Sequence, residues 1–187
     1  MGVPSGNWKD IYFRMKNLLL IAFSALVVFL PCCKSVAWYP MDAPSAELMN
    51  DKVIGKWRVE EDTDKNNYFE VARSQRDYMY DVTYWNMGGA NPVYKTNLFF
   101  SKINNFLFLN VTCWKDERAD SIYAQEAGYC FEKILKVDPE FTKMTMVTAT
   151  DTSLAGLNSS LEVFNRVAKN LNVKSFYGDT VHFYKLK

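Results

Sequence analysis

Two cysteines, Cys113 and Cys130, have the spacing to react with each other and form a disulfide. They lie 17 positions apart, each beside an apolar run, and the charged segment over residues 115–120 separates them. Outside the cytosol a pair of this kind tends to oxidise, and closing a loop of this size contributes roughly 3 kcal/mol in the chain-entropy model. The alternative interpretation is a pair of unpaired thiols in the core.

Other reactive groups are sparse. His182 is the single histidine of the chain, and it lies in a strand-like run where a surface or core role is more common than general-base catalysis. The acidic run over residues 60–64 is typical of a solvated turn, and the charged segment over 115–120 is typical of a loop tip. Cys113 and Cys130 lack the C-x-x-C spacing of a zinc site. We therefore expect no catalytic residue, no metal, no cofactor and no enzymatic activity.

The elements that would carry these residues have the pattern of β-strands. Aromatic residues make up 16% of the chain, and sheets accommodate rings readily. Apolar and polar residues alternate with period two, most clearly around residues 78–84. Asn104-Asn105 and Gly178-Asp179 are predicted turns. The predicted strands cover residues 53–60, 67–73, 77–85, 93–102, 106–113, 122–125, 129–137, 141–148 and 180–186.

One late segment has helical spacing instead. Ser159 and Glu162 form a capping box at its start, and the helix is expected to end near Asn172. Its apolar stripe is expected to pack on the sheet or to close one end of a barrel. The stripe consists of Leu161, Phe164, Val167, Ala168 and Leu171.

The N-terminal region has the pattern of an export signal. A basic start around Met15 precedes an almost wholly apolar run over residues 18–30. That run is shorter than the ~20 residues that span a bilayer, and the small residues after it allow cleavage following Ala37. We expect residues 1–37 to form the export signal region, with residues 1–14 preceding a second candidate start.

Cys33 offers a different way of processing the same signal, because it resembles the lipid-bearing cysteine of bacterial lipoproteins. Lipidation of Cys33 would tether the protein to a membrane, whereas cleavage after Ala37 would leave Trp38 as the first residue. Both alternatives predict an exported protein, periplasmic or membrane-anchored. The net charge of +1 gives no electrostatic attraction to nucleic acid, so no nucleic-acid partner is expected.

Consecutive strands followed by one late helix predict a mainly β fold. Eight or nine short strands in sequence order are expected to pair with their neighbours and close into an antiparallel up-and-down barrel over residues 53–187, because closure removes exposed edges. Residues 38–52 contain Pro40 and Pro44 and no clear period, so they are predicted to be an N-terminal arm or tether.

The start of the first predicted strand supports this architecture. Gly55-Lys56-Trp57 resembles the Gly-x-Trp signature of lipocalins, in which the Trp plugs the closed end of the barrel and the Gly lets the backbone bend. The helix before the final strand also resembles the lipocalin order of elements. Residues 53–187 are similar, too, to uncharacterised exported bacterial lipoproteins. The resemblance implies a lipocalin-like barrel but no particular activity.

A barrel of eight strands is either filled by its own side chains or holds one small ligand. The first hypothesis is a non-enzymatic protein of the bacterial envelope that binds a small apolar ligand. The alternative is an envelope interaction module with a filled barrel and no ligand. The expected ligand-binding residues are Trp57, Tyr80, Tyr84, Phe108, Met144 and Met146.

Overall fold

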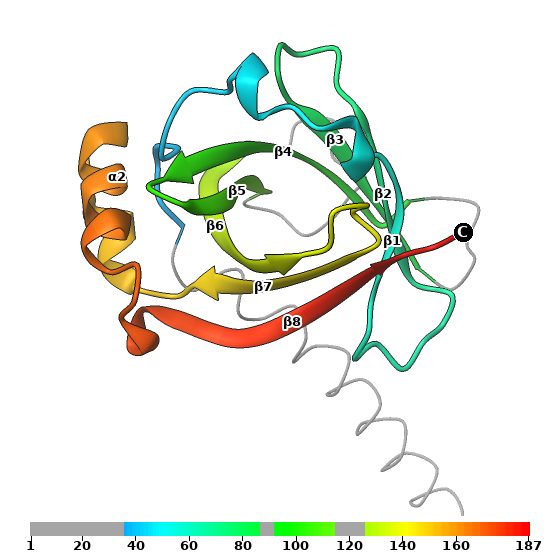
Figure 1. Cartoon of the computed structure of the whole chain (residues 1–187). Helices are drawn as coiled ribbons and strands as arrows, with labels where there is room; N and C mark the ends of the chain where they lie inside the picture. Colours follow the sequence, from blue (N-terminus) through cyan, green and yellow to red (C-terminus); the bar gives the residue numbers. More distant parts are fainter. Residues whose placement is uncertain (1–35, 87–91, 115–125) are drawn as a thin grey trace, which may run out of the picture. The chain divides into compact units, whose positions relative to one another are not determined.

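A closed barrel of eight antiparallel strands, each paired with its neighbours in sequence order, forms the body of the molecule (Figure 1). This computed structural model describes residues 36–86, 92–114 and 126–187. The predicted mainly β, up-and-down barrel with one helix before the final strand is confirmed. The strands are β1 (Gly55–Val59), β2 (Tyr68–Arg73), β3 (Tyr80–Trp85), β4 (Tyr94–Ile103), β5 (Phe106–Trp114), β6 (Glu126–Val137), β7 (Lys143–Ala149) and β8 (Tyr177–Lys185).

One detail of the sequence-based prediction is untested and another is wrong. The ninth predicted strand, at residues 122–125, lies outside the described residues. Gly178 and Asp179, predicted to form a turn, lie inside β8, because the long connection after β7 already reverses the chain before Tyr177. The Asn104-Asn105 turn is confirmed: Asn104 has a φ of 54° between β4 and β5, a conformation that Asn tolerates.

The strand register sorts the apolar residues into two groups, one inside the barrel and one on its outer face. Trp57 pairs with Phe69, Tyr80 with Leu98, and Met144 with Phe183, which places these side chains on the inner face. We call the buried inner group the barrel cluster. It comprises Val53, Trp57, Val71, Tyr80, Val82, Leu98, Phe100, Leu109, Ile134, Phe141, Met144 and Met146.

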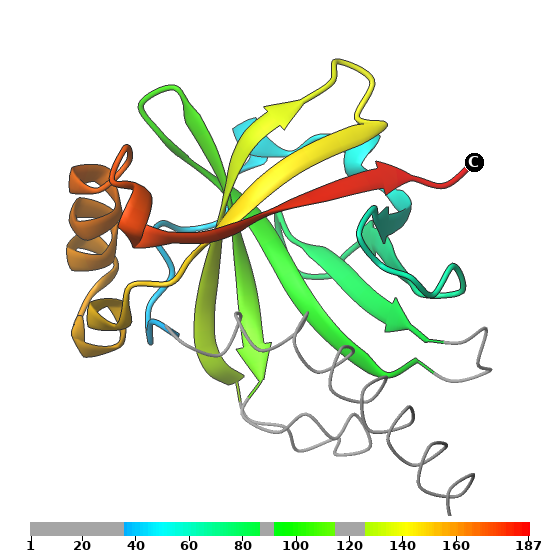
Figure 2. The ribbon, with the colours of Figure 1, turned by 90° about the horizontal axis from the view of Figure 1, so that it is seen from below.

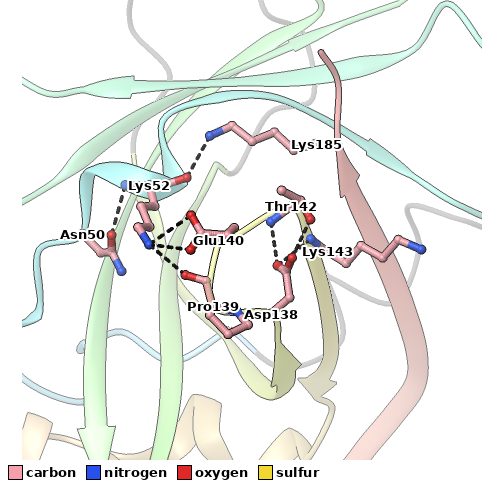
Figure 3. A network of polar contacts seen from close by, with 8 residues as sticks. All are labelled: Asn50, Lys52, Asp138, Pro139, Glu140, Thr142, Lys143 and Lys185. Atoms are coloured by element: carbon pink, nitrogen blue, oxygen red, sulfur yellow. Dashed lines mark hydrogen bonds and ion pairs between the residues drawn. The ribbon is translucent and has the colours of Figure 1, made fainter.

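Two short 3-10 helices, η1 (Ala46–Leu48) and η2 (Asp51–Val53), precede β1 and contact the barrel cluster at one end of the barrel. Lys52 of η2 donates from Nζ to the Pro139 carbonyl (3.0 Å) and pairs with the Glu140 carboxylate (3.3 Å), both in the β6–β7 turn (Figure 3). Lys185 Nζ donates to the Lys52 carbonyl (2.8 Å). These contacts hold η2 against two strand ends, so this end of the barrel is closed.

Trp57 fills the closed end from within. Its indole is 3% exposed, and Nε1 donates to the Val53 carbonyl at 2.8 Å. The Lys185 Nζ lies 5.8 Å from the centre of the indole. Gly55 has a φ of +137°, and a Cβ at this position would lie 2.6 Å from Lys185 Cε. Gly55 therefore allows the backbone conformation at the start of β1, and Trp57, two positions later, places its ring in the closed end.

Helix α2 (Ser160–Lys169) packs on the outer face of the barrel, to one side of the strands in both ribbon views (Figure 1, Figure 2). Its predicted start is confirmed, since Ser159 Oγ accepts the Glu162 N–H at 3.2 Å. The predicted stripe is partly wrong: Leu161 is 68% exposed, whereas Val163 is fully buried with Val167. The buried face follows the i, i+4 series from residue 163, so Leu161 falls on the solvent side.

The residues buried beneath α2 form a second group, the outer cluster, separate from the barrel interior. Each buried Val of α2 contributes on the order of 1.5–3 kcal/mol by leaving water. The outer cluster comprises Ala37, Met41, Ile103, Phe108, Phe131, Ala149, Leu154, Val163, Val167, Leu171 and Phe176.

Lys133 links α2 to the outer face of β6. Its side chain is 5% exposed, and Nζ donates to the Leu171 carbonyl at 2.6 Å while lying 3.9 Å from the centre of the Phe106 ring. A cation is favourable beside the carbonyls at the end of a helix, and the aromatic ring offsets part of its desolvation. Burial lowers the pKa of Lys133.

The segment before β1, predicted to be an arm or tether, is docked on the barrel from Ala37 onward. Ala37 and Tyr129 exchange two backbone hydrogen bonds, at 3.0 and 2.7 Å. Gly128 has a φ of +124°, and a Cβ there would lie 2.3 Å from the Ala37 carbonyl oxygen. Asn110, fully buried, accepts the Met41 N–H at 3.0 Å and donates to Ser101 Oγ at 2.7 Å.

The predicted export signal and Cys33 lie almost wholly within residues 1–35, outside the described residues. In the part of the chain that is described, no helix is both long and apolar enough to cross a membrane.

Replacing Gly55 with Ala is expected to lower the free energy of unfolding by about 1–3 kcal/mol, because a side chain is strained at this positive φ. Gly156→Ala is the matched control, since no heavy atom lies within 4 Å of a Cβ at Gly156. Chemical denaturation of both variants measures the difference. Equal stability of the two variants would contradict the role assigned to Gly55.

Candidate functional site

The inner face of the barrel is the candidate functional site, since most of the predicted ligand-binding residues converge there. Trp57, Tyr80, Met144 and Met146 belong to the barrel cluster, and Tyr84 joins the same face through its pairing with Phe69. All five are buried.

Phe108, the sixth predicted residue, lies elsewhere. It is fully buried in the outer cluster beneath α2, on the face of β5 opposite to Leu107 and Leu109. Phe106, Phe108 and Leu107, Leu109 are all apolar, so β5 is apolar on both faces. In such a strand the sequence carries no period-two signal to say which residues point inward.

Two of the inward residues are already occupied by structural contacts at the closed end. Trp57 Nε1 donates to the Val53 carbonyl. The Tyr80 hydroxyl accepts the Asn50 N–H at 2.7 Å and donates to the Asn50 carbonyl at 3.2 Å. The Tyr80 ring also meets Phe100 edge-on at 5.9 Å. These residues therefore form the floor of the barrel.

An aromatic group on β2, β3 and β4 lies further along the inner face. The Tyr84 ring lies 5.0 Å from Phe69 and 5.2 Å from Tyr94, and Phe69 lies 6.2 Å from Phe183 on β8. Burial, with smaller contributions from Asp62 and Asp64, raises the pKa of Tyr84 to about 12. This group offers flat apolar surface to a bound molecule.

Glu132 is the inward residue that the sequence-based prediction missed. It pairs with Leu109 on β5 and Thr148 on β7, so its side chain shares the inner face with Leu109 and with Ile134 two positions on. Its two carboxyl oxygens lie 2.9 and 2.8 Å from Thr148 Oγ1. Among the residues that the structure describes, Thr148 is the only hydrogen-bond partner of this carboxyl group.

The Glu132–Thr148 contact leaves the carboxylate short of donors. One hydroxyl has one hydrogen, so it donates to one carboxylate oxygen at a time, whereas an ionised carboxylate accepts several hydrogen bonds. Burial raises the pKa of Glu132 to about 7, and the Thr148 hydrogen bond opposes only part of that rise. Glu132 is nevertheless half-buried rather than sealed from solvent. Such a group is typical of a binding or catalytic site.

A signal for Glu132 was present in the sequence. Cys130, Glu132 and Ile134 alternate on one side of a predicted strand, and Phe131 and Lys133 alternate on the other. A charge therefore interrupts each apolar side, and a charged residue on a buried face requires a partner. The structure separates the two roles: Lys133 anchors α2 outside the barrel, and Glu132 faces inward.

His182, the residue considered for general-base catalysis, is on the surface. The His182 side chain is 46% exposed, its Nδ1 lies 3.1 Å from Thr145 Oγ1, and its Nε2 lies 3.9 Å from Glu61 Oε1. Thr145 and His182 face outward, since their strand neighbours Met146 and Val181 face inward. Within the described ranges, no three His, Cys, Asp or Glu side chains gather into a metal site.

The register brings the backbones of the two predicted disulfide cysteines onto neighbouring strands. Cys113 pairs with Gly128, and Val111 with Cys130, and the register shifts between Cys113 and Trp114. Cys130 is 1% exposed. The disulfide between Cys113 and Cys130 remains a prediction.

Glu132→Gln is expected to remove a pH dependence of stability. Because the folded pKa, about 7, lies above the ordinary value of 4.5, the folded state binds more protons between these values and unfolding becomes easier as pH rises through them. We expect the variant to gain stability relative to the unaltered chain from pH 5 to pH 8, by on the order of 3 kcal/mol at most. Urea denaturation across this range measures the gain, and a constant or shrinking difference would contradict it.

Comparisons of the chain with protein-family models, with curated proteins and with solved structures found no match.

Proposed function

We propose that this protein is a non-enzymatic barrel that binds a small, largely apolar molecule on its inner face, as an exported component of the bacterial envelope. The observation that carries the proposal is the incomplete burial of the inner face. Several inward residues on β2 and β4 to β8 stay half-buried, whereas Trp57 and Tyr80 of the floor are almost fully buried. The half-buried inward residues include Phe69, Tyr94, Leu107, Val111, Glu132, Val137, Thr148, Val181 and Phe183.

The chemistry of this surface suits a ligand of mixed character. Small-molecule sites are mostly apolar with a few polar groups that fix orientation, and here an aromatic group shares the inner face with one carboxyl group and one hydroxyl. The floor formed by Trp57 and Tyr80 supports entry from the opposite end, where β1 is followed by residues 60–67 and β7 by residues 150–176. The alternative is an interaction module whose barrel carries no ligand and whose outer face or loops contact a partner.

Export would require the leader to be removed, and the docking of Ala37 favours removal upstream of Val36. Cleavage after Ala37 would delete the residue that pairs with Tyr129 and would leave the positive φ of Gly128 without the neighbour it accommodates. Processing at Cys33 would retain that contact. We therefore propose the lipidated form, tethered through Cys33, over the form that begins at Trp38. Oxidation of Cys113 and Cys130 would accompany export.

Saturable binding of the neutral fluorophore N-phenyl-1-naphthylamine is expected, with one molecule per chain, because its rings match the aromatic inner surface. Val181→Phe should weaken binding by about tenfold or more. The larger side chain would occupy part of the inner face, and the ligand would lose apolar contact there. His182→Phe is the matched control at the adjacent, outward position and should leave affinity unchanged. Fluorescence titration measures both. Absence of saturable binding would favour the interaction module.

Expression of the full chain in a bacterium tests the processing. The intact mass of the protein purified from the envelope is expected to include Ala37 and to exceed the polypeptide mass by that of a lipid. Cys33→Ser should abolish the added mass and release the protein from the membrane fraction. A mature chain that begins at Trp38 would overturn the proposed site.

A further inference from the structure

The Glu132–Thr148 pair on the inner face carries an inference about the ligand itself. Glu132 projects from the middle of the long strand β6, away from the closed end, and both of its carboxyl oxygens share the single hydroxyl of Thr148. No cationic side chain among the described residues forms an ion pair with it. The carboxyl group is therefore under-supplied with donors, in a residue that is half-buried as a whole.

We propose that the barrel selects a cationic amphiphile: a molecule with an apolar body and a protonated amine that Glu132 binds as its counter-ion. This inference rests on the proposed function and names its ligand class. An ammonium group brings up to three donors and a positive charge to a carboxylate that has one hydroxyl. The apolar body would lie on the aromatic group of Phe69, Tyr84 and Tyr94.

Other head groups fit this carboxyl group less well. An anionic head, such as that of a fatty acid, would place two carboxylates together in a site of low polarity, which disfavours both charges. A neutral alcohol offers one hydrogen bond and no charge. The order expected from the site is therefore amine first, then alcohol, then carboxylate, for molecules with the same apolar body.

The surroundings of Glu132 also predict how pH acts on binding. On the two strands paired with β6, the residues opposite Glu132 are Leu109 and Thr148, and neither ionises in the range of interest. The charged residues on the inward series lie at strand ends beside the floor, and the remaining inward ionisable groups are phenols. These residues are Arg73, Lys102 and Lys185, together with Tyr80, Tyr84 and Tyr94.

Isothermal titration of the purified chain with decylamine, decanol and decanoate, each below its micelle concentration, tests the inference. Decylamine should bind about tenfold or more tightly than decanol at pH 8, the magnitude of a charged hydrogen bond. Its affinity should rise from pH 6 to pH 8 as Glu132 ionises, because burial places the pKa of Glu132 near 7. The affinity of decanol should not follow this rise.

Glu132→Gln keeps the shape of the side chain and removes its charge, so it should abolish the preference for decylamine over decanol. Glu70→Gln is the matched control, because Glu70 lies on the outward face of β2, where it accepts a hydrogen bond from Trp85 Nε1 at 3.1 Å. This control should leave the preference intact.

The outcomes separate the inference from the function on which it rests. Equal binding of decylamine and decanol, or a preference that survives Glu132→Gln, would overturn the inference while leaving a ligand-binding barrel. Failure of all three probes and of the neutral fluorophore would overturn the ligand-binding function as well. The head-group order and the pH series use the unaltered chain, so they decide the question even if the variant does not fold.

Discussion

The pairing of β1 with β8 is the interaction on which the rest of the structure depends. Trp57 lies opposite Lys185, and Val59 opposite Phe183, so β1 and β8 complete the ladder and none of the eight described strands is left with an open edge. Closure gives every strand one face toward a shared interior. It also makes the position of each side chain, inside or outside, a consequence of register, because a shift by one residue would exchange the two faces.

That constraint explains why two charged neighbours on β6 have opposite roles. Lys133 faces outward, where it meets the Leu171 carbonyl and the Phe106 ring, and so becomes part of the packing of α2. Glu132 faces inward, and among the described residues its carboxyl group forms hydrogen bonds only with Thr148. Burial lowers the pKa of the lysine on one face and raises that of the glutamate on the other, because it disfavours both charged forms.

The sequence predicts the architecture well, because strand alternation, turn residues and the capping box at Ser159 are local signals. Gly55 and Trp57 also point to the closed end, where a positive φ and a buried indole are found. It predicts the inner face less well. Both sides of β5 are apolar, so Phe108 and Leu109 differ only in register, and that register is fixed by pairing with β4 and β6.

The buried face of α2 and the partner of Glu132 could not be predicted from local sequence for the same reason. Leu161 fits a helical stripe, but the outer surface of the barrel buries the series that begins at Val163. Glu132 is one carboxylate in a run of mixed residues, and only the closed ladder shows that Thr148 faces it across the β6–β7 pair. Tertiary context decides between apolar residues that the sequence alone leaves equivalent.

The place of β8 in the chain, after the connection that contains α2, has a consequence for how the protein matures. Until Tyr177–Lys185 is available, β1 and β7 each present an unpaired row of backbone donors and acceptors. A nascent or truncated polypeptide would thus expose two unpaired strand edges that can pair with other molecules. Long-range pairing between β1 and β8 is also slow to form, so the barrel stays prone to self-association until β8 has been synthesised and paired.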